Sequence, residues 1–256
     1  MATAAAALLA RTLAGMPRDQ HSMLVSSGQS QPAPFDRASF ERVQDVDWLE
    51  YQLDLQAQRW PSVDRRVLAT LWWYSVSQVF LTPTLASLFV TGCALSPRPA
   101  DVELHSLPDG RIFTARSTAV LVESDVVDSV AAALRDGLAM AIPEVARAGA
   151  TRERPLWALA TDSLANRLLW LGHASGAVDR ATSLATTLVQ LIGPPMPAPR
   201  YVDIQRQAPR AGTVRFVRRG SCCLVYLEPG EAKCASCPRM SPVSREALLR
   251  TAADGA

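Results

Sequence analysis

The stretch from Val67 to Leu95 constrains the fold most, because its 29 residues include no charged side chain. That length is sufficient for a helix to span a bilayer. Polar Ser, Thr and Gln residues interrupt the stretch, however, and Pro83 near its centre would break a helix. We therefore predict two buried helices joined at Thr82–Pro83, with a membrane span as the alternative.

The rest of the chain predicts an α+β fold, with a mainly helical body, β-hairpins and a small carboxyl-terminal hairpin rich in cysteine. Apolar residues at helical spacing predict further helices over 36–59, 124–147 and 155–171. A hairpin is expected over 102–116, where Pro108-Asp109-Gly110 suits a tight turn between apolar runs. Short runs of β-formers follow at 214–217 and 222–227.

Two segments without a regular spacing of apolar residues indicate where the chain divides into parts. Residues 17–37 are rich in Pro, Ser and Gln and predict a loop, and the prolines of 193–199 predict a stiff linker. The apolar residues before Arg11 follow no basic residue, so they predict a frayed or docked helix rather than a secretory signal. The expected division is a flexible segment over 1–35, a mainly helical body over 36–199 and a carboxyl-terminal segment over 200–256.

Charge and cysteine usage narrow the functional class. A net charge of +2 gives no indication of nucleic-acid binding, although residues 200–239 carry eight basic and three acidic side chains. Four of the five cysteines lie within sixteen residues, which is not the pattern of a disulfide framework spread along a secreted chain. A reducing cytoplasm is the expected location, and peripheral association with the inner face of the membrane is left open.

The cysteines form the most specific motif: Cys222-Cys223, ten residues, then Cys234, two residues and Cys237. Pro229 and Gly230 between the two pairs predict a type II turn that brings the pairs together. Four thiolates bind a soft metal, either zinc or iron. Structural zinc sites usually use two Cys-x-x-Cys knuckles, whereas adjacent cysteines on an extended strand point in opposite directions. The spacing therefore favours two tetrahedral irons over one zinc.

This motif resembles that of the FhuF-like siderophore-iron reductases, whose carboxyl-terminal pattern is Cys-Cys-x10-Cys-x2-Cys, and the spacing matches without gaps. Upstream, the resemblance is one of layout, with helices containing Trp72, Trp73 and Pro83, a hairpin, and a helix carrying Trp157. The resemblance implies that Cys222, Cys223, Cys234 and Cys237 bind a [2Fe-2S] cluster. It also implies an oxidoreductase that reduces ferric iron in a siderophore, of the hydroxamate type, and releases Fe(II).

The electron must then come from a partner, because the glycine spacing excludes a Gly-x-Gly-x-x-Gly motif and no phosphate loop surrounds Lys233. A ferredoxin or a flavoprotein reductase is the expected donor. Basic residues near the cysteines would attract such an acidic donor or an anionic siderophore, or they are simply solvated; they are Arg215, Arg218, Arg219, Lys233 and Arg239. Catalytic residues beyond the cluster are not expected.

Other candidate residues carry weaker signals. His21, His105 and His173 are scattered and are expected to be ordinary surface or core residues. Asp162 and Asn166 lie one helical turn apart, so they either touch the substrate or form a solvent-facing polar stripe. Two other functions stay open: a zinc-binding structural or interaction domain, and a [2Fe-2S] electron carrier or sensor with no siderophore substrate.

Overall fold

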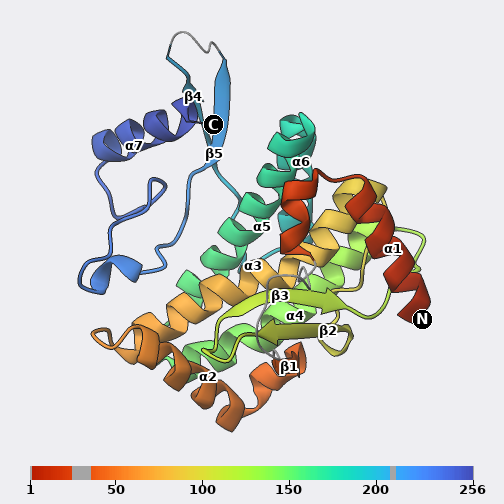
Figure 1. Cartoon of the computed structure of the whole chain (residues 1–256), viewed down its shortest axis with the longest axis horizontal. Helices are drawn as coiled ribbons and strands as arrows, with labels where there is room; N and C mark the ends of the chain where they lie inside the picture. Colours follow the sequence, from red (N-terminus) through yellow and green to blue (C-terminus); the bar gives the residue numbers. More distant parts are fainter. Residues whose placement is uncertain (1, 25–35, 208–211, 256) are drawn as a thin grey trace.

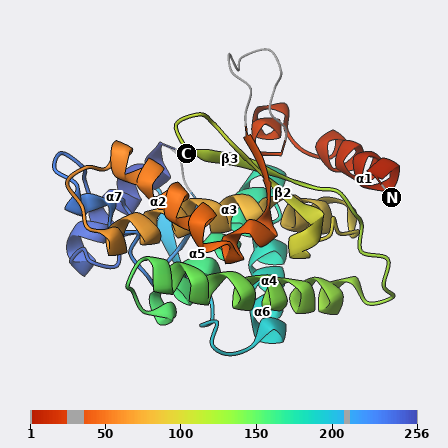
Figure 2. The same cartoon turned by 90° about the horizontal axis from the view of Figure 1, so that it is seen from below.

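The computed structural model describes residues 2–24, 36–207 and 212–255. Within these ranges the chain is mainly helical, with a three-stranded and a two-stranded antiparallel sheet, and this confirms the α+β prediction. The cysteine-bearing carboxyl-terminal segments lie at one end of the molecule and the amino-terminal helix α1 lies at the other (Figures 1 and 2).

Helix α3 (Arg65–Thr91) forms the centre of the molecule. It contacts helices α1 (Ala2–Ala14), α2 (Val46–Arg59), α4 (Val126–Ala148) and α5 (Glu153–Ser175) and strand β3 (Ile112–Ser117). It begins at Asp64, whose side chain accepts a hydrogen bond from the Val67 amide, and ends at Gly92, which adopts a left-handed φ of 73°. The prediction of buried helical structure is confirmed, because the side chains of α3 form much of the main core.

The predicted break at Thr82–Pro83 is wrong, since α3 runs through Pro83 without interruption. Proline removes one backbone donor, but packing on all sides outweighs the loss of that single hydrogen bond. Hydroxyl groups next to it bind nearby carbonyls: Thr82 donates to the Gln78 carbonyl at 2.6 Å and Ser87 to the Pro83 carbonyl at 2.8 Å. Among the helices that the structure describes, none is long and apolar enough to cross a membrane.

Four other helices belong to the helical body, and three of them, α2, α4 and α5, pack on α3. Helices α4 (Val126–Ala148) and α5 (Glu153–Ser175) confirm the predictions over 124–147 and 155–171. The helix predicted over 36–59 is shorter than expected: Asp36–Ser39 forms strand β1, Phe40–Gln44 a 3-10 turn, and only Val46–Arg59 the helix α2. Helix α6 (Val178–Ile192), which packs on α5 and α4, was not predicted.

The three-stranded sheet covers one side of α3, in the order β1-β2-β3. Strands β2 (Val102–Ser106) and β3 (Ile112–Ser117) form the predicted hairpin. Its turn contains Gly110 with a φ of 78°, a left-handed conformation that glycine adopts readily in a tight turn. The sheet therefore adds a second layer to the helical body.

The amino-terminal helix packs against the helical body. Helix α1 (Ala2–Ala14) buries Ala5 and Leu8 and contacts α3, so the docked alternative is correct and this part of the segment expected to be flexible is packed. A 3-10 turn follows over Arg18–Met23. The remainder of the loop predicted over 17–37 lies mostly outside the described residues.

The carboxyl-terminal part begins after the proline-rich segment 193–199, which contains neither helix nor strand. Strands β4 (Tyr201–Gln205) and β5 (Thr213–Val217) form a hairpin, and helix α7 (Pro242–Asp254) packs on it. The strand predicted over 222–227 is wrong, because this segment forms irregular backbone and a single 3-10 turn, η4 (Val225–Leu227). The division of the chain at residues 35 and 199 stays a prediction.

Candidate metal centre

The cysteine segment, residues 220–239, lies between β5 and α7 and packs on the first turns of α3 (Figure 1). Cys222, Cys223 and Cys237 are buried in a small apolar cluster with Val67 and Leu71 of that helix. Cys234 is exposed. The site is therefore a pocket of thiols at the surface of the helical body, with one thiol open to solvent.

A turn between the two cysteine pairs brings them together. The Glu231 amide donates to the Glu228 carbonyl at 3.1 Å, and Gly230 has a φ of 89°, which confirms the predicted reversal. The Glu228 carboxylate accepts a hydrogen bond from the Ser62 amide at 3.2 Å, just before α3. The turn is therefore attached to the body as well as closed on itself.

Contacts of the four sulfur atoms join cysteines from the two sides of the turn. The Sγ atoms of Cys222 and Cys237 are 3.6 Å apart. The Sγ atoms of Cys223 and Cys234 lie 3.9 and 3.5 Å from the same nitrogen, Nη1 of Arg219. The Cys222 thiol also contacts the thiol of Cys223, so Cys222 has a sulfur contact both with its neighbour and with Cys237.

Leu224 allows this arrangement by turning the chain directly after Cys223. Its φ of 68° is left-handed, a conformation that costs about 1–2 kcal/mol for a residue with a Cβ. The Leu224 amide points back at Cys222 and lies 3.4 Å from its Sγ. The buried Leu224 side chain packs in the same apolar cluster, and this packing offsets the cost of the backbone conformation.

Arg219 is the cation of the site and is almost completely buried, with 3% of its surface exposed. Its guanidinium carbon lies 4.6 Å from the centre of the Tyr74 ring, and Nε lies 3.6 Å from Oδ2 of Asp162. Nε and Nη2 are nevertheless buried donors with no hydrogen-bond partner. Unsatisfied N–H groups of a buried guanidinium are costly, so this position calls for an acceptor beside the sulfurs.

Asp162 of α5 holds the start of the cysteine segment in place. Its carboxylate accepts hydrogen bonds from the Gly220 amide at 2.8 and 3.0 Å and from the Ser221 amide at 3.1 Å. The side chain is buried, so the solvent-facing stripe considered for Asp162 is wrong, and the substrate contact stays a prediction. Asn166 donates to the Asp162 carbonyl at 2.8 Å and contacts none of the cysteines.

The electrostatics of the site favour thiolate at Cys223. A hydrogen bond from the neighbouring Cys222 thiol lowers the pKa of Cys223 to about 5, and Arg219 adds to this effect. The same hydrogen bond, together with burial, raises the pKa of Cys222. Burial also raises the pKa of Asp162, although the two amides and Arg219 oppose the rise. For Arg219, burial lowers the pKa but Tyr74 and the two thiols outweigh it, so its pKa is raised.

Several residues considered from the sequence lie away from this site. His21 contacts the Met16 carbonyl, His173 contacts the Arg215 carbonyl, and His105 lies on β2 near Glu103.

Two of the basic residues considered near the cysteines are not part of an exposed basic surface. Arg215 forms ion pairs with Asp203 and Asp179, and the Arg219 side chain is buried. In the described ranges, no three His, Cys, Asp or Glu side chains converge on one metal position.

Comparison with known proteins points to one family. Residues 219–239, from Arg219 to just beyond the last cysteine, match the model of the FhuF 2Fe-2S C-terminal domain. The site thus has the form of an FhuF-type iron–sulfur segment, and the resemblance to the FhuF-like family is confirmed over these residues. No curated protein matches the chain with significance.

Proposed function

We propose that the chain is a ferric-siderophore reductase of the FhuF type, in which Cys222, Cys223, Cys234 and Cys237 hold one [2Fe-2S] cluster. The observation that supports it is the spacing of the Cys222 and Cys237 sulfurs. Two thiolates on one tetrahedral metal with bonds of about 2.3 Å are separated by about 3.7 Å. The Cys222–Cys237 separation of 3.6 Å fits one iron, and Cys223 and Cys234, which both contact Nη1 of Arg219, remain as the ligands of the other.

The protein environment also fits the cluster. Two unpaired donors on Arg219 provide hydrogen bonds that a sulfide-bearing centre would accept, and the guanidinium balances its negative charge. A bound cluster would supply one electron at a time. The four cysteines would hold it beside α3, Arg219 would donate hydrogen bonds to it, and Asp162 fixes the start of the cysteine segment through the Gly220 and Ser221 amides. The exposed Cys234 would leave one edge open to solvent.

The reaction consumes one electron from an external donor, a ferredoxin or a flavoprotein reductase, for each Fe(III) reduced. Hard hydroxamate oxygens hold Fe(III) tightly and Fe(II) far less well, so adding one electron to the substrate iron releases it. Because only the iron–oxygen bonds open and no covalent bond within the siderophore is made or cut, the chain needs only to position the chelate near the exposed edge.

Anaerobic purification with assays for iron, sulfide and zinc tests the cofactor. We expect about two irons per chain and a rhombic electron paramagnetic resonance signal after dithionite reduction. Cys237→Ser should abolish both, whereas Cys93→Ser should retain them, because Cys93 lies outside the cysteine segment. A colourless protein with one tightly held zinc would instead support the structural zinc domain.

Turnover then tests the substrate. The loaded protein, a donor and a ferric hydroxamate should yield one Fe(II) per electron, trapped by a ferrous-specific chelator, and the rate should saturate with chelate. A cluster-bearing protein that shows no saturable binding of ferric hydroxamates would be an electron carrier or sensor.

A further inference from the structure

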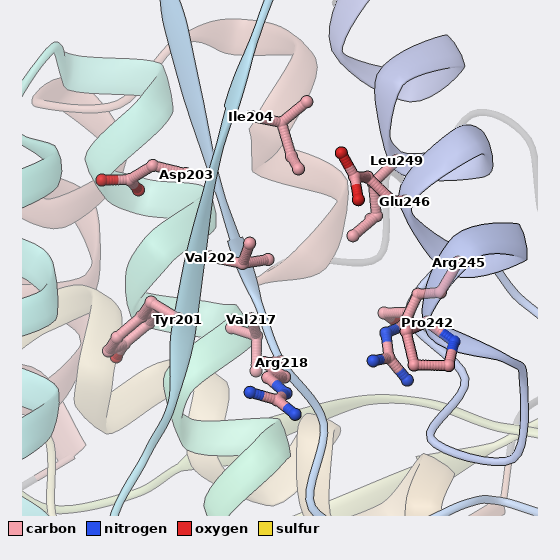
Figure 3. Close-up of a pocket in the computed structure, with 11 residues that line it drawn as sticks. Tyr201, Val202, Asp203, Ile204, Val217, Arg218, Pro242, Arg245, Glu246 and Leu249 are labelled. Atoms are coloured by element: carbon pink, nitrogen blue, oxygen red, sulfur yellow. The ribbon is translucent and has the colours of Figure 1, made fainter.

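A groove between the β4–β5 hairpin and α7 adjoins the exposed edge of the cysteine site (Figure 3). Its volume is about 430 Å³. Val202 and Ile204 form the strand wall, and Pro242 and Leu249 form the helix wall. A concave site with apolar walls and a few polar groups is the usual form of a small-molecule site.

The groove reaches the metal centre through Ser236 and Arg218. Ser236 lines the groove, and its Oγ lies 3.9 Å from Sγ of Cys234, the exposed cysteine. Arg218, also in the lining, directly precedes Arg219, which contacts the same sulfur. A molecule bound here would therefore lie beside the most accessible edge of the proposed cluster.

Charge in the groove is positive. Figure 3 shows the guanidinium groups of Arg218 and Arg245 at the same end of the groove. No ion pair in the described part of the chain involves either one. The two acidic residues of the lining are neutralised elsewhere: Asp203 by Arg215 at 2.7 Å, and Glu246 by Arg250 at 2.6 Å.

We infer that this groove binds the ferric chelate and selects hydroxamate complexes that carry a negative charge. The apolar walls would contact the hydrocarbon parts of the siderophore, and the two arginines would pair with a carboxylate or with the anionic face of the complex. The inference rests on the proposed function for its substrate class, but binding in the groove requires no electron transfer.

Gallium(III) complexes test it, because gallium has the charge and coordination of ferric iron and is not reduced under these conditions. One linear trihydroxamate with a terminal amine gives a matched series: the free amine is cationic, the acetylated form neutral and the succinylated form anionic. Calorimetry with the cluster-bearing protein should show at least tenfold tighter binding of the anionic complex than of the cationic one. The preference should weaken as salt is raised.

The double variant Arg218→Gln/Arg245→Gln should lose this preference, and Arg239→Gln should keep it, since Arg239 is an exposed arginine outside the groove. Equal affinities for the three complexes, no binding of any of them, or a preference that survives the double variant would overturn the inference. Charge-selective gallium binding without ferric reduction would refute the reductase and leave the groove assignment standing.

Discussion

At the residue scale, Arg219 is the group through which the protein can set the potential of the proposed cluster. Reduction would add one negative charge to the site, and a buried cation 3.5 Å from Sγ of Cys234 would stabilise that charge in a region that water screens poorly. We expect Arg219→Gln to disfavour reduction at least tenfold, which is a fall of about 59 mV in the midpoint potential of a one-electron couple. A redox titration followed by electron paramagnetic resonance measures it.

Two further variants separate charge from structure. Arg239→Gln removes an exposed cation from the same segment and should leave the potential close to that of the native protein, because water screens exposed charges. Asp162→Asn removes the negative charge beside Arg219 and should raise the potential, opposite to the effect of Arg219→Gln. Potentials that fall in both site variants, or in neither, would mean that Arg219 acts only as packing.

At the element scale, α5 and α6 are in close contact, since a Cβ at Gly172 would lie 2.6 Å from Ala181 Cβ and 3.1 Å from Val178 Cα. Neither Val178 Cα nor Ala181 Cβ can move aside without a shift of the α6 backbone, whereas the end of a long side chain can. We expect Gly172→Ala to lower the free energy of unfolding by about 1–3 kcal/mol, the usual cost of overpacking, as measured by denaturant titration.

Gly137→Ala in α4 is the matched control. Its Cβ would meet only the end of the Phe80 ring at 3.1 Å and Pro99 Cγ at 3.6 Å, both side-chain atoms. The ring can shift slightly, so this variant should cost clearly less than Gly172→Ala. Equal losses in the two variants would show that α5 and α6 can move apart.

The sequence predicted elements whose signals are local and missed those that depend on partners. The Asp-Gly turn and the Pro-Gly turn were predictable because glycine marks a left-handed φ. Helix α7 was not predicted, although it too has a local signal, with Ser241 as its cap and Pro242 in its first turn. Continuation through Pro83, by contrast, depends on burial by surrounding elements, and β4 is a strand only because β5 pairs with it.

The candidate site divides in the same way. The four cysteines and their turn could be predicted from spacing alone. The roles of Arg219 and Asp162 could not, because residue 162 lies 58 positions from Gly220 along the chain and meets it only through the packing of α5. Arg219 was grouped with exposed basic residues, since nothing in the sequence distinguishes its inward direction from that of its neighbour Arg218.

At the scale of the whole molecule, the exposed basic side chain of Lys233 and the exposed Cys234 lie at the same end. Lys233 adjoins the exposed Cys234, and its Nζ donates to the Arg239 carbonyl at 3.2 Å, so it is held beside the site. Arg11 of α1 is an equally exposed cation at the opposite end of the molecule (Figures 1 and 2). The net charge of +2 is too small to steer a partner without such local concentration.

An acidic [2Fe-2S] ferredoxin as donor should therefore reduce the protein faster at low ionic strength, with a rate that falls as salt is added. Lys233→Glu should slow the bimolecular step severalfold at low salt, and the difference should close at high salt. Arg11→Glu changes the total charge by the same amount and should have little effect, since α1 lies far from the exposed cysteine. Stopped-flow absorbance measures all three rates. If both reversals slow the reaction equally, the donor responds to total charge; if neither does, the donor docks elsewhere and the basic residues around the cysteines are only solvated.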